Sequence, residues 1–290
     1  MLHVCYSLIG HFSGPIGISL RPVTGTEYMK KSVFRIVVVG LLFMASFGLV
    51  AELAFSHGDF KLPRVSPPEE YGDVLMKGPS SKAGAVTPVI FSHWVHRAKY
   101  TCRVCHGELE FSMKANETGV ICGNGEAKNR YCTVCHNGKI AFATKDDEGD
   151  NCKRCHNADQ SPNGERFFAL QKSLPLAKFG NEIDWVKALD NGSIKPKNSL
   201  SGSSQPLGLD KTLTLAAEMS GIPPVVFPHK SHVQWLDCAN CHPDIFNIKK
   251  KTTKHFSMSR ILDGEFCGVC HLRIAFPLNE CKKCHPSMRN

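Results

Sequence analysis

The chain has 290 residues, of which 42% are hydrophobic, and it carries a formal net charge of +9. It contains 24 glycines and 17 prolines and few long periodic apolar patterns, which argues against a protein of long helices or regular sheets. A core made of protein side chains alone would be thin for this length. We therefore expect a mainly irregular chain with short α-helices.

The N-terminal region carries the pattern of a secretory signal peptide, which we place at residues 29–56. Basic residues follow Met29, and the apolar run Ile36–Ala51 comes next. This run is short for a membrane span, so we expect cleavage after Ser56. A retained inner-membrane anchor is the alternative. Residues 1–28 precede the pattern, and we expect Met29 to be the initiator.

A five-residue unit, Cys-x-x-Cys-His, occurs six times in the rest of the chain. The cysteines of these units are Cys102, Cys105, Cys132, Cys135, Cys152, Cys155, Cys238, Cys241, Cys267, Cys270, Cys281 and Cys284. The histidines that follow them are His106, His136, His156, His242, His271 and His285. Six repeats of one short pattern are very improbable by chance, so they indicate a shared chemistry.

Cys-x-x-Cys-His is the attachment unit of c-type haem. Two thiols three positions apart lie on one side of a helical turn, where they can form thioethers to one porphyrin. The histidine then supplies an axial ligand to the iron. Zinc needs four converging ligands but does not require a histidine at the fifth place. A redox dithiol would need a βαβ context, which is not visible in the sequence. We therefore predict six covalently bound haem c groups.

The haem-binding part of the chain is a tandem repeat. The stretch "VIFSHWVHRAKYTCRVCH" from Val89 matches "VVFPHKSHVQWLDCANCH" from Val225 without a gap. Each copy has two histidines, nine and six residues before its first cysteine, and three attachment units. Residues 158–221 separate the copies and are rich in turn-forming residues, although "NEIDWVKAL" could form one short helix.

This arrangement closely resembles the triheme cytochrome c7 family and its tandem relatives, over roughly residues 86–157 and 222–286. The resemblance implies tandem c7-like domains packed around haems. It also implies that the paired histidines are distal ligands: His93 for the haem of His106, His96 for that of His136, His229 for that of His242, and His232 for that of His271. The expected division is residues 57–157 as the first triheme domain with an N-terminal extension, 158–221 as a linker, and 222–290 as the second triheme domain.

In such domains a third residue, between the first two attachment units, ligates the third haem. In the second copy we favour Met258 over His255. The first copy has no histidine at that place. It offers Met113, ranked ahead of His57, the expected mature N-terminus, and of the unpaired Cys122.

We therefore predict an exported hexahaem cytochrome that carries single electrons in an anaerobic respiratory chain, without being an enzyme itself. The expected partners are an inner-membrane quinol-oxidising complex, other cytochromes and a terminal reductase. The expected location is the periplasm, or the outer surface or extracellular space. The alternatives are a multihaem reductase of a small substrate such as nitrite, and a subunit of an extracellular cytochrome filament.

The net positive charge does not indicate a nucleic-acid partner. The propionates of six haems would offset most of the excess of lysine and arginine. We therefore expect no nucleic acid among the partners, and no membrane span once the signal is cleaved.

Overall fold

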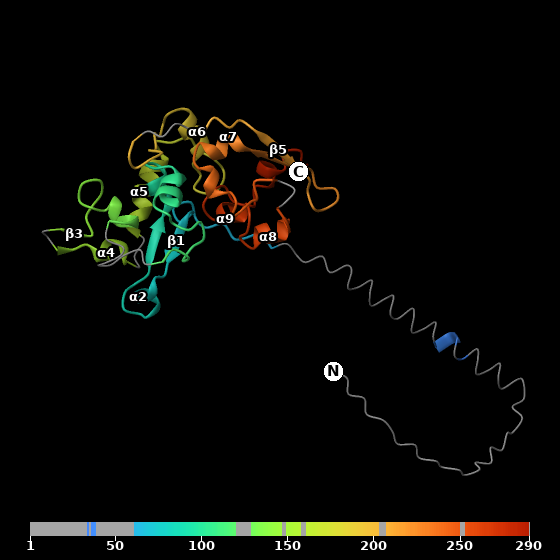
Figure 1. The fold of residues 1–290 in the computed structure, drawn as a ribbon, viewed down its shortest axis with the longest axis horizontal. Coiled ribbons are helices and arrows are strands. Elements are labelled where there is room, and N and C mark those ends of the chain that lie inside the picture. Colours follow the sequence, from blue (N-terminus) through green and yellow to red (C-terminus); the bar gives the residue numbers. More distant parts are fainter. Residues whose placement is uncertain are drawn as a thin grey trace, which may run out of the picture. The chain divides into compact units, whose positions relative to one another are not determined.

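The computed structural model describes residues 34, 36–38, 61–119, 129–146, 149–157, 161–202, 207–249 and 253–289. The chain divides into two compact units, Met1–Asp59 and Phe60–Asn290 (Figure 1). In the first unit, only residues 34 and 36–38 are described, and they are helical. The rest of the predicted signal peptide, together with His57 and Cys122, lies outside the described residues. No helix in the described ranges is long and apolar enough to cross a membrane.

The second unit begins with an antiparallel hairpin of β1 (Asp73–Met76) and β2 (Val89–Ser92), in which Asp73 pairs with Ser92 and Met76 with Val89. The β-branched and aromatic residues of β2 favour a strand. The elements that follow in the first copy are short: α3 (His93–Arg97), η1 (Val104–Glu108), η2 (Tyr131–Val134), β3 (Lys145–Asp146), β4 (Gly149–Asp150) and α4 (Cys152–Cys155). The turn of the hairpin carries α2 (Pro79–Lys82).

The second copy repeats this start. Strands β5 (Thr212–Leu215) and β6 (Val225–Pro228) form the equivalent hairpin, with Thr212 opposite Pro228. The elements after it are again short: α7 (His229–Val233), η3 (Cys238–Asn240), α8 (Met258–Leu262), α9 (Gly268–His271) and α10 (Cys281–Cys284). The expected fold class, mostly irregular chain with short helices, is confirmed, with small two-stranded sheets added to it.

Helices α8 and α9 pack unusually closely, at a glycine inside the fifth attachment unit. A Cβ atom on Gly268 would lie 1.9 Å from the carbonyl oxygen of Ile261, a distance that no real contact reaches. Only glycine therefore allows the backbone of this attachment turn to approach the preceding helix.

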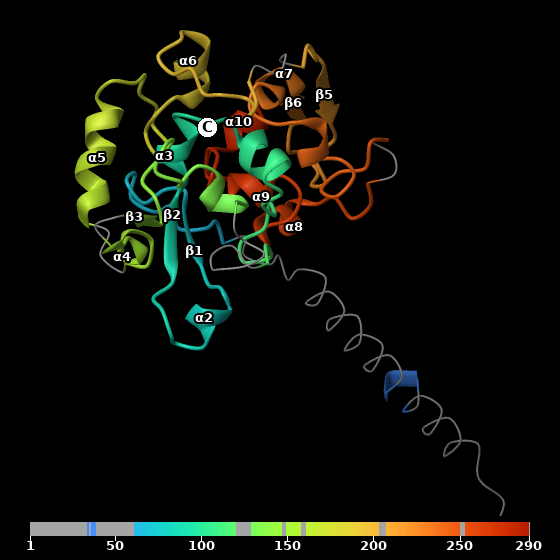
Figure 2. The same ribbon diagram turned by 60° about the vertical axis from the view of Figure 1, so that its left-hand side comes forward.

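The segment between the copies, residues 158–221, which we expected to be a linker, contains α5 (Ser161–Gln171) and α6 (Trp185–Asp190), and near its end it also contains β5, which pairs with β6 of the second copy. Asp184 caps α6 by accepting a hydrogen bond from the backbone N–H of Lys187 at 3.0 Å. In Figure 2, α5 lies at the left edge and α6 at the top, and α3 lies on the inner side of α5. The limits of the domains remain a prediction.

This segment supplies most of the apolar core. The core joins all three tryptophans of the chain to aliphatic and aromatic neighbours: Trp94, Phe167, Leu174, Ile183, Trp185, Ala188, Ile194 and Trp235. Trp94 comes from α3 in the first copy, and its ring meets that of Phe167 in α5 edge to face, with centroids 5.3 Å apart. Trp235 follows α7 in the second copy. Residues of both copies therefore pack on the segment that separates them in sequence.

Candidate haem-binding site

Each attachment unit folds as a short helical turn. In five of the six, the backbone N–H of the histidine donates to the carbonyl of the first cysteine, at 2.7 to 2.9 Å: His136 to Cys132, His156 to Cys152, His242 to Cys238, His271 to Cys267 and His285 to Cys281. The remaining unit, the first in the chain, runs from Cys102 to His106 across the start of η1, a wider turn. These turns place both thiols and the imidazole close together, as the sequence spacing predicts.

The thiols of these turns are buried to different extents, and burial raises the pKa of several of them. The pKa rises to about 12 for Cys105, Cys267 and Cys270, in each case chiefly because burial disfavours the thiolate. A reactive dithiol requires the opposite, a stabilised thiolate, so these buried thiols do not fit a redox dithiol.

Ten histidines share one hydrogen-bonding pattern: their Nδ1 atom meets a backbone carbonyl oxygen. The proximal set is His106 with Phe111, His136 with Phe142, His156 with Thr87, His242 with Phe246, His271 with Phe276 and His285 with Pro223. The distal candidates are His93 with Gly72, His96 with Ser92, His229 with Lys211 and His232 with Pro228. A carbonyl can only accept, so Nδ1 carries the proton in every case and Nε2 is left free to bind a metal.

In three of the four predicted pairs of axial histidines, the two rings lie opposite each other across a narrow gap, parallel in the first pair and tilted by 57° and 60° in the other two. The ring centroids are 6.5 Å apart for His93 and His106, 6.4 Å for His96 and His136, and 6.3 Å for His232 and His271. A metal–nitrogen bond is about 2.0 Å and each ring adds about 1 Å, so two rings on opposite sides of one ion lie about 6 Å apart. These pairs therefore have the separation that a shared iron requires.

The fourth predicted pair is His229 and His242. In each imidazole, Nδ1 again donates a hydrogen bond to a backbone carbonyl. No ring contact joins the two imidazoles in the described part of the chain. The partner of His229 is Lys211, which precedes β5 as Gly72 precedes β1 in the first copy. The hairpin therefore orients His229 as it orients His93, and its ligation remains a prediction.

Low pKa values accompany the burial of these imidazoles. Burial lowers the pKa of His93 to about 3 and that of His271 to about 4, with smaller contributions from the nearby Arg97. A buried imidazole with a low pKa is neutral at physiological pH, which is the form that binds iron.

Phenylalanine side chains, which the sequence analysis did not single out, support the histidines. Phe91 stacks on His96 at 4.4 Å between ring centroids, and Phe227 lies 4.3 Å from His232 in the second copy. Phe142 and Phe276 contact His136 and His271, at 4.4 and 4.3 Å. A phenylalanine four to six residues after four of the attachment histidines was the available signal.

The third distal ligand of each copy is less well defined by the structure than the paired histidines are. Met258 begins α8, and its backbone N–H donates to the Glu218 carboxylate at 3.2 Å. His255 is exposed and lines a pocket with Glu218 and Arg260. In the described ranges, His255 has no carbonyl partner for Nδ1. Met113 is half-buried in the loop after η1. The third ligands remain predictions.

Six attachment turns, ten oriented imidazoles and the paired rings together define a multihaem c-type cytochrome. Residues 89–157 and 225–287 match the family described as cytochrome c7 and related cytochrome c. The chain is thus a cytochrome c7-like protein with two c7 regions, as the resemblance in the sequence indicated, and its twelve paired cysteines suggest about six haems.

The individual proteins that this chain resembles are only 24 to 25% identical to it. The chain is 24% identical over 233 residues to the nine-haem cytochrome c of Desulfovibrio desulfuricans, covering 71% of this chain and 68% of that protein. Similar solved structures include the C-terminal hexahaem fragment of GSU1996, with 24% identity over 76% of this chain and 99% of that one, and a TM-score of 0.23. The N-terminal hexahaem fragment of GSU1996 is 25% identical, covers 75% of this chain and 99% of that one, and has the same TM-score.

Proposed function

We propose that this chain is an exported hexahaem electron carrier in an anaerobic respiratory chain. The observation that carries the proposal is the set of histidine pairs 6.3 to 6.5 Å apart, each ring with its Nδ1 proton held by a carbonyl. A haem with two such ligands has no open position for a substrate. When bound, each haem would accept and release one electron at its iron.

The residues of the chain have defined tasks in this proposal. The twelve paired cysteines bind the six porphyrins covalently, and the six histidines that follow them are the proximal ligands. His93, His96, His229 and His232 are distal ligands, held neutral and oriented by carbonyls. Met258 and Met113 complete the remaining two sites. Methionine with histidine gives a higher haem potential than two histidines, so these sites would lie at the high-potential end.

Export supports this function, since the signal pattern at residues 29–56 would deliver the chain to the compartment where c-type haem is attached. We propose a periplasmic location and partners on both sides: a quinol-oxidising complex of the inner membrane, other cytochromes, and a terminal reductase. An expression experiment with cell fractionation and N-terminal sequencing tests the location. Recovery of the holoprotein starting at His57 from the periplasm is expected, and a membrane-bound product that retains residue 29 would instead show an anchor.

The central test is performed on the purified holoprotein from a host that matures c-type cytochromes. Intact mass should equal residues 57–290 plus six haems, and electron paramagnetic resonance should show low-spin ferric iron throughout. Several five-coordinate, high-spin irons together with turnover of nitrite would overturn the carrier proposal in favour of a reductase. Concentration-dependent assembly into long polymers in light scattering would instead favour the filament subunit.

A further inference from the structure

Two attachment turns that belong to different copies touch each other. The first turn of the first copy runs through η1, and the first turn of the second copy runs through η3. Arg103, inside the first of these turns, forms an ion pair with Asp237, which directly precedes Cys238, at 2.9 Å between Nη2 and Oδ2. The backbone N–H of Arg103 donates to the carbonyl of Trp235 at 3.1 Å. The arginine side chain is 16% exposed and the aspartate side chain 37%, so water reaches the pair from the aspartate side only in part.

Asn240 joins the same two turns from the other side. It occupies a variable position of the fourth unit and is 5% exposed. Its Nδ2 donates to the carbonyl oxygen of His106 at 3.0 Å, and its Oδ1 accepts from the N–H of Asp237 at 2.7 Å. Both ends of this amide are therefore used: the NH₂ group donates to one turn and the carbonyl oxygen accepts from the other.

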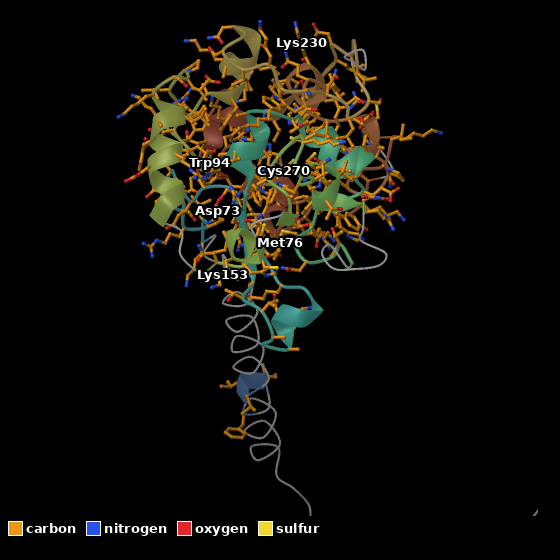
Figure 3. The ribbon with its side chains drawn as sticks, turned by 90° about the vertical axis from the view of Figure 1, so that its left-hand side faces the viewer. Asp73, Met76, Trp94, Lys153, Lys230 and Cys270 are labelled. Carbon is orange, nitrogen blue, oxygen red and sulfur yellow. The ribbon has the colours of Figure 1, made fainter. Side chains whose placement is uncertain are left out.

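The attachment thiols of both copies include half-buried ones, among them Cys102 in the first copy and Cys241 and Cys270 in the second. Figure 3 shows Cys270 in the interior, with Trp94 also inside and Lys230 at the periphery.

The surrounding packing holds this contact in place. Arg97 lies over the rings of Trp185 and Trp235, with its guanidinium carbon 5.3 and 5.8 Å from the two centroids. The backbone of Lys197, from the segment between the copies, bonds both Lys99 and Thr101, at 2.8 and 2.9 Å. The segment between the copies is thus hydrogen-bonded to the chain immediately before the first attachment turn.

We infer that Arg103 and Asn240 are positioning residues, which hold the haem of His106 and the haem of His242 at a constant separation and make this junction the electron crossing between the two triheme domains. The inference rests on the proposed function. In the step concerned, one electron leaves a ferrous haem of one domain and reduces a ferric haem of the other, with no bond made or broken. Since the porphyrins are attached to these two turns, a bond between the turns sets the gap that the electron crosses.

The test uses Asn240→Asp and Arg103→Ala in the full-length holoprotein. Asn240→Asp keeps the shape of the side chain but replaces the donor to the His106 carbonyl by an oxygen. Lys153→Ala is the matched control, because Lys153 has the place in the third unit that Arg103 has in the first, and it is exposed. Charge reversal, Arg103→Asp with Asp237→Arg, tests whether the ion pair itself matters.

Two measurements report on the junction. Soret circular dichroism should show a weaker exciton couplet from neighbouring haems in both single variants. Electron redistribution after pulsed reduction is followed in a His232→Met background, whose altered ligation marks one haem of the second domain. It should slow by about tenfold or more, because small displacements of reacting groups lower rates steeply. Relative to Arg103→Ala, the charge-reversed double variant should regain both the couplet and the redistribution rate. Lys153→Ala should change neither of them.

The outcomes separate this inference from the proposed function. If the parent protein lacks six low-spin haems, the proposed function fails, and the inference about electron transfer across the junction fails with it. If six low-spin haems are present and both variants retain the couplet and the redistribution rate, Arg103 and Asn240 do not position the crossing, and the inference is overturned. Mass spectrometry of each variant establishes that all six haems are attached before either signal is read.

Discussion

The imidazole rings of His93 and His106 lie parallel, at an interplanar angle of 4°, with their centroids 6.5 Å apart. They belong to separate short elements, α3 and η1, and each is oriented by a carbonyl: Gly72 for His93 and Phe111 for His106. The protein fold alone thus holds two imidazoles on opposite sides of a gap wide enough for a metal ion. With an iron bound there, such a site would need little rearrangement when the iron changes charge.

Removal of one distal imidazole should leave one haem iron with a vacant coordination position. In His93→Ala, the haem of His106 is expected to become five-coordinate, since no other described histidine faces that ring at the required separation. Electron paramagnetic resonance should show one high-spin ferric centre among six, and carbon monoxide should bind one haem after reduction. Six low-spin centres in this variant would contradict the assignment of His93.

The choice between Met258 and His255 can be made by a pair of variants. Met258→Leu should convert the haem of His285 to a high-spin form and remove one of the two highest-potential steps of a spectroelectrochemical titration, since methionine ligation raises haem potential. His255→Leu should leave both properties unchanged. The opposite pattern would assign the ligand to His255.

Adjacent phenylalanines of α5 provide a matched test of the core. Phe167 is fully buried and contacts Trp94, whereas Phe168 is 42% exposed. Phe167→Ala should lower the free energy of unfolding by about 3–5 kcal/mol, because a large buried ring leaves a cavity. Phe168→Ala should cost much less, and denaturant titration measures both. Equal, small effects would show that the segment between the copies is not part of the stabilising core.

Asp73 should make stability depend on pH. Burial raises the pKa of this carboxyl to about 6, with the Ser92 hydroxyl lowering it and Glu70 raising it by smaller amounts. Between its ordinary pKa of 3.8 and about 6, the folded state retains a proton that the unfolded state has lost. This contribution to stability is therefore present at low pH, falls as pH rises to about 6, and is constant above it.

Asp73→Asn removes this dependence. Relative to the parent, the variant should be more stable at neutral pH and lose that advantage toward pH 4, as measured by thermal unfolding at a series of pH values. Asp244→Asn, at an exposed carboxyl, is the control. A difference between variant and parent that stays the same at every pH would contradict the raised pKa.

Much of the site could be predicted because the relevant spacings are local. A Cys-x-x-Cys-His unit closes within one helical turn, so its chemistry follows from five adjacent residues. The two histidines before each first cysteine are equally local, since three positions place His93 and His96 on one short helix. Three of the four predicted ring pairs accordingly meet at the distance that a shared iron needs.

The segment between the copies was harder to predict. Its glycines, prolines and serines indicate turns, and the turns are present, but the same stretch carries Phe167, Ile183 and Trp185 into the core. Whether such isolated apolar residues are buried depends on what the rest of the chain presents to them, which here is a tryptophan from each copy.

The class of this protein, its number of attachment units and its duplication follow from local sequence, because covalent attachment depends on residues within one turn. The fold sets which distant carbonyls orient His156 and His285, namely those of Thr87 and Pro223, each more than sixty residues away. It also decided that Arg103 and Asn240 join the first attachment turns of the two copies. Such contacts form only when distant segments are buried together, and no local spacing encodes them.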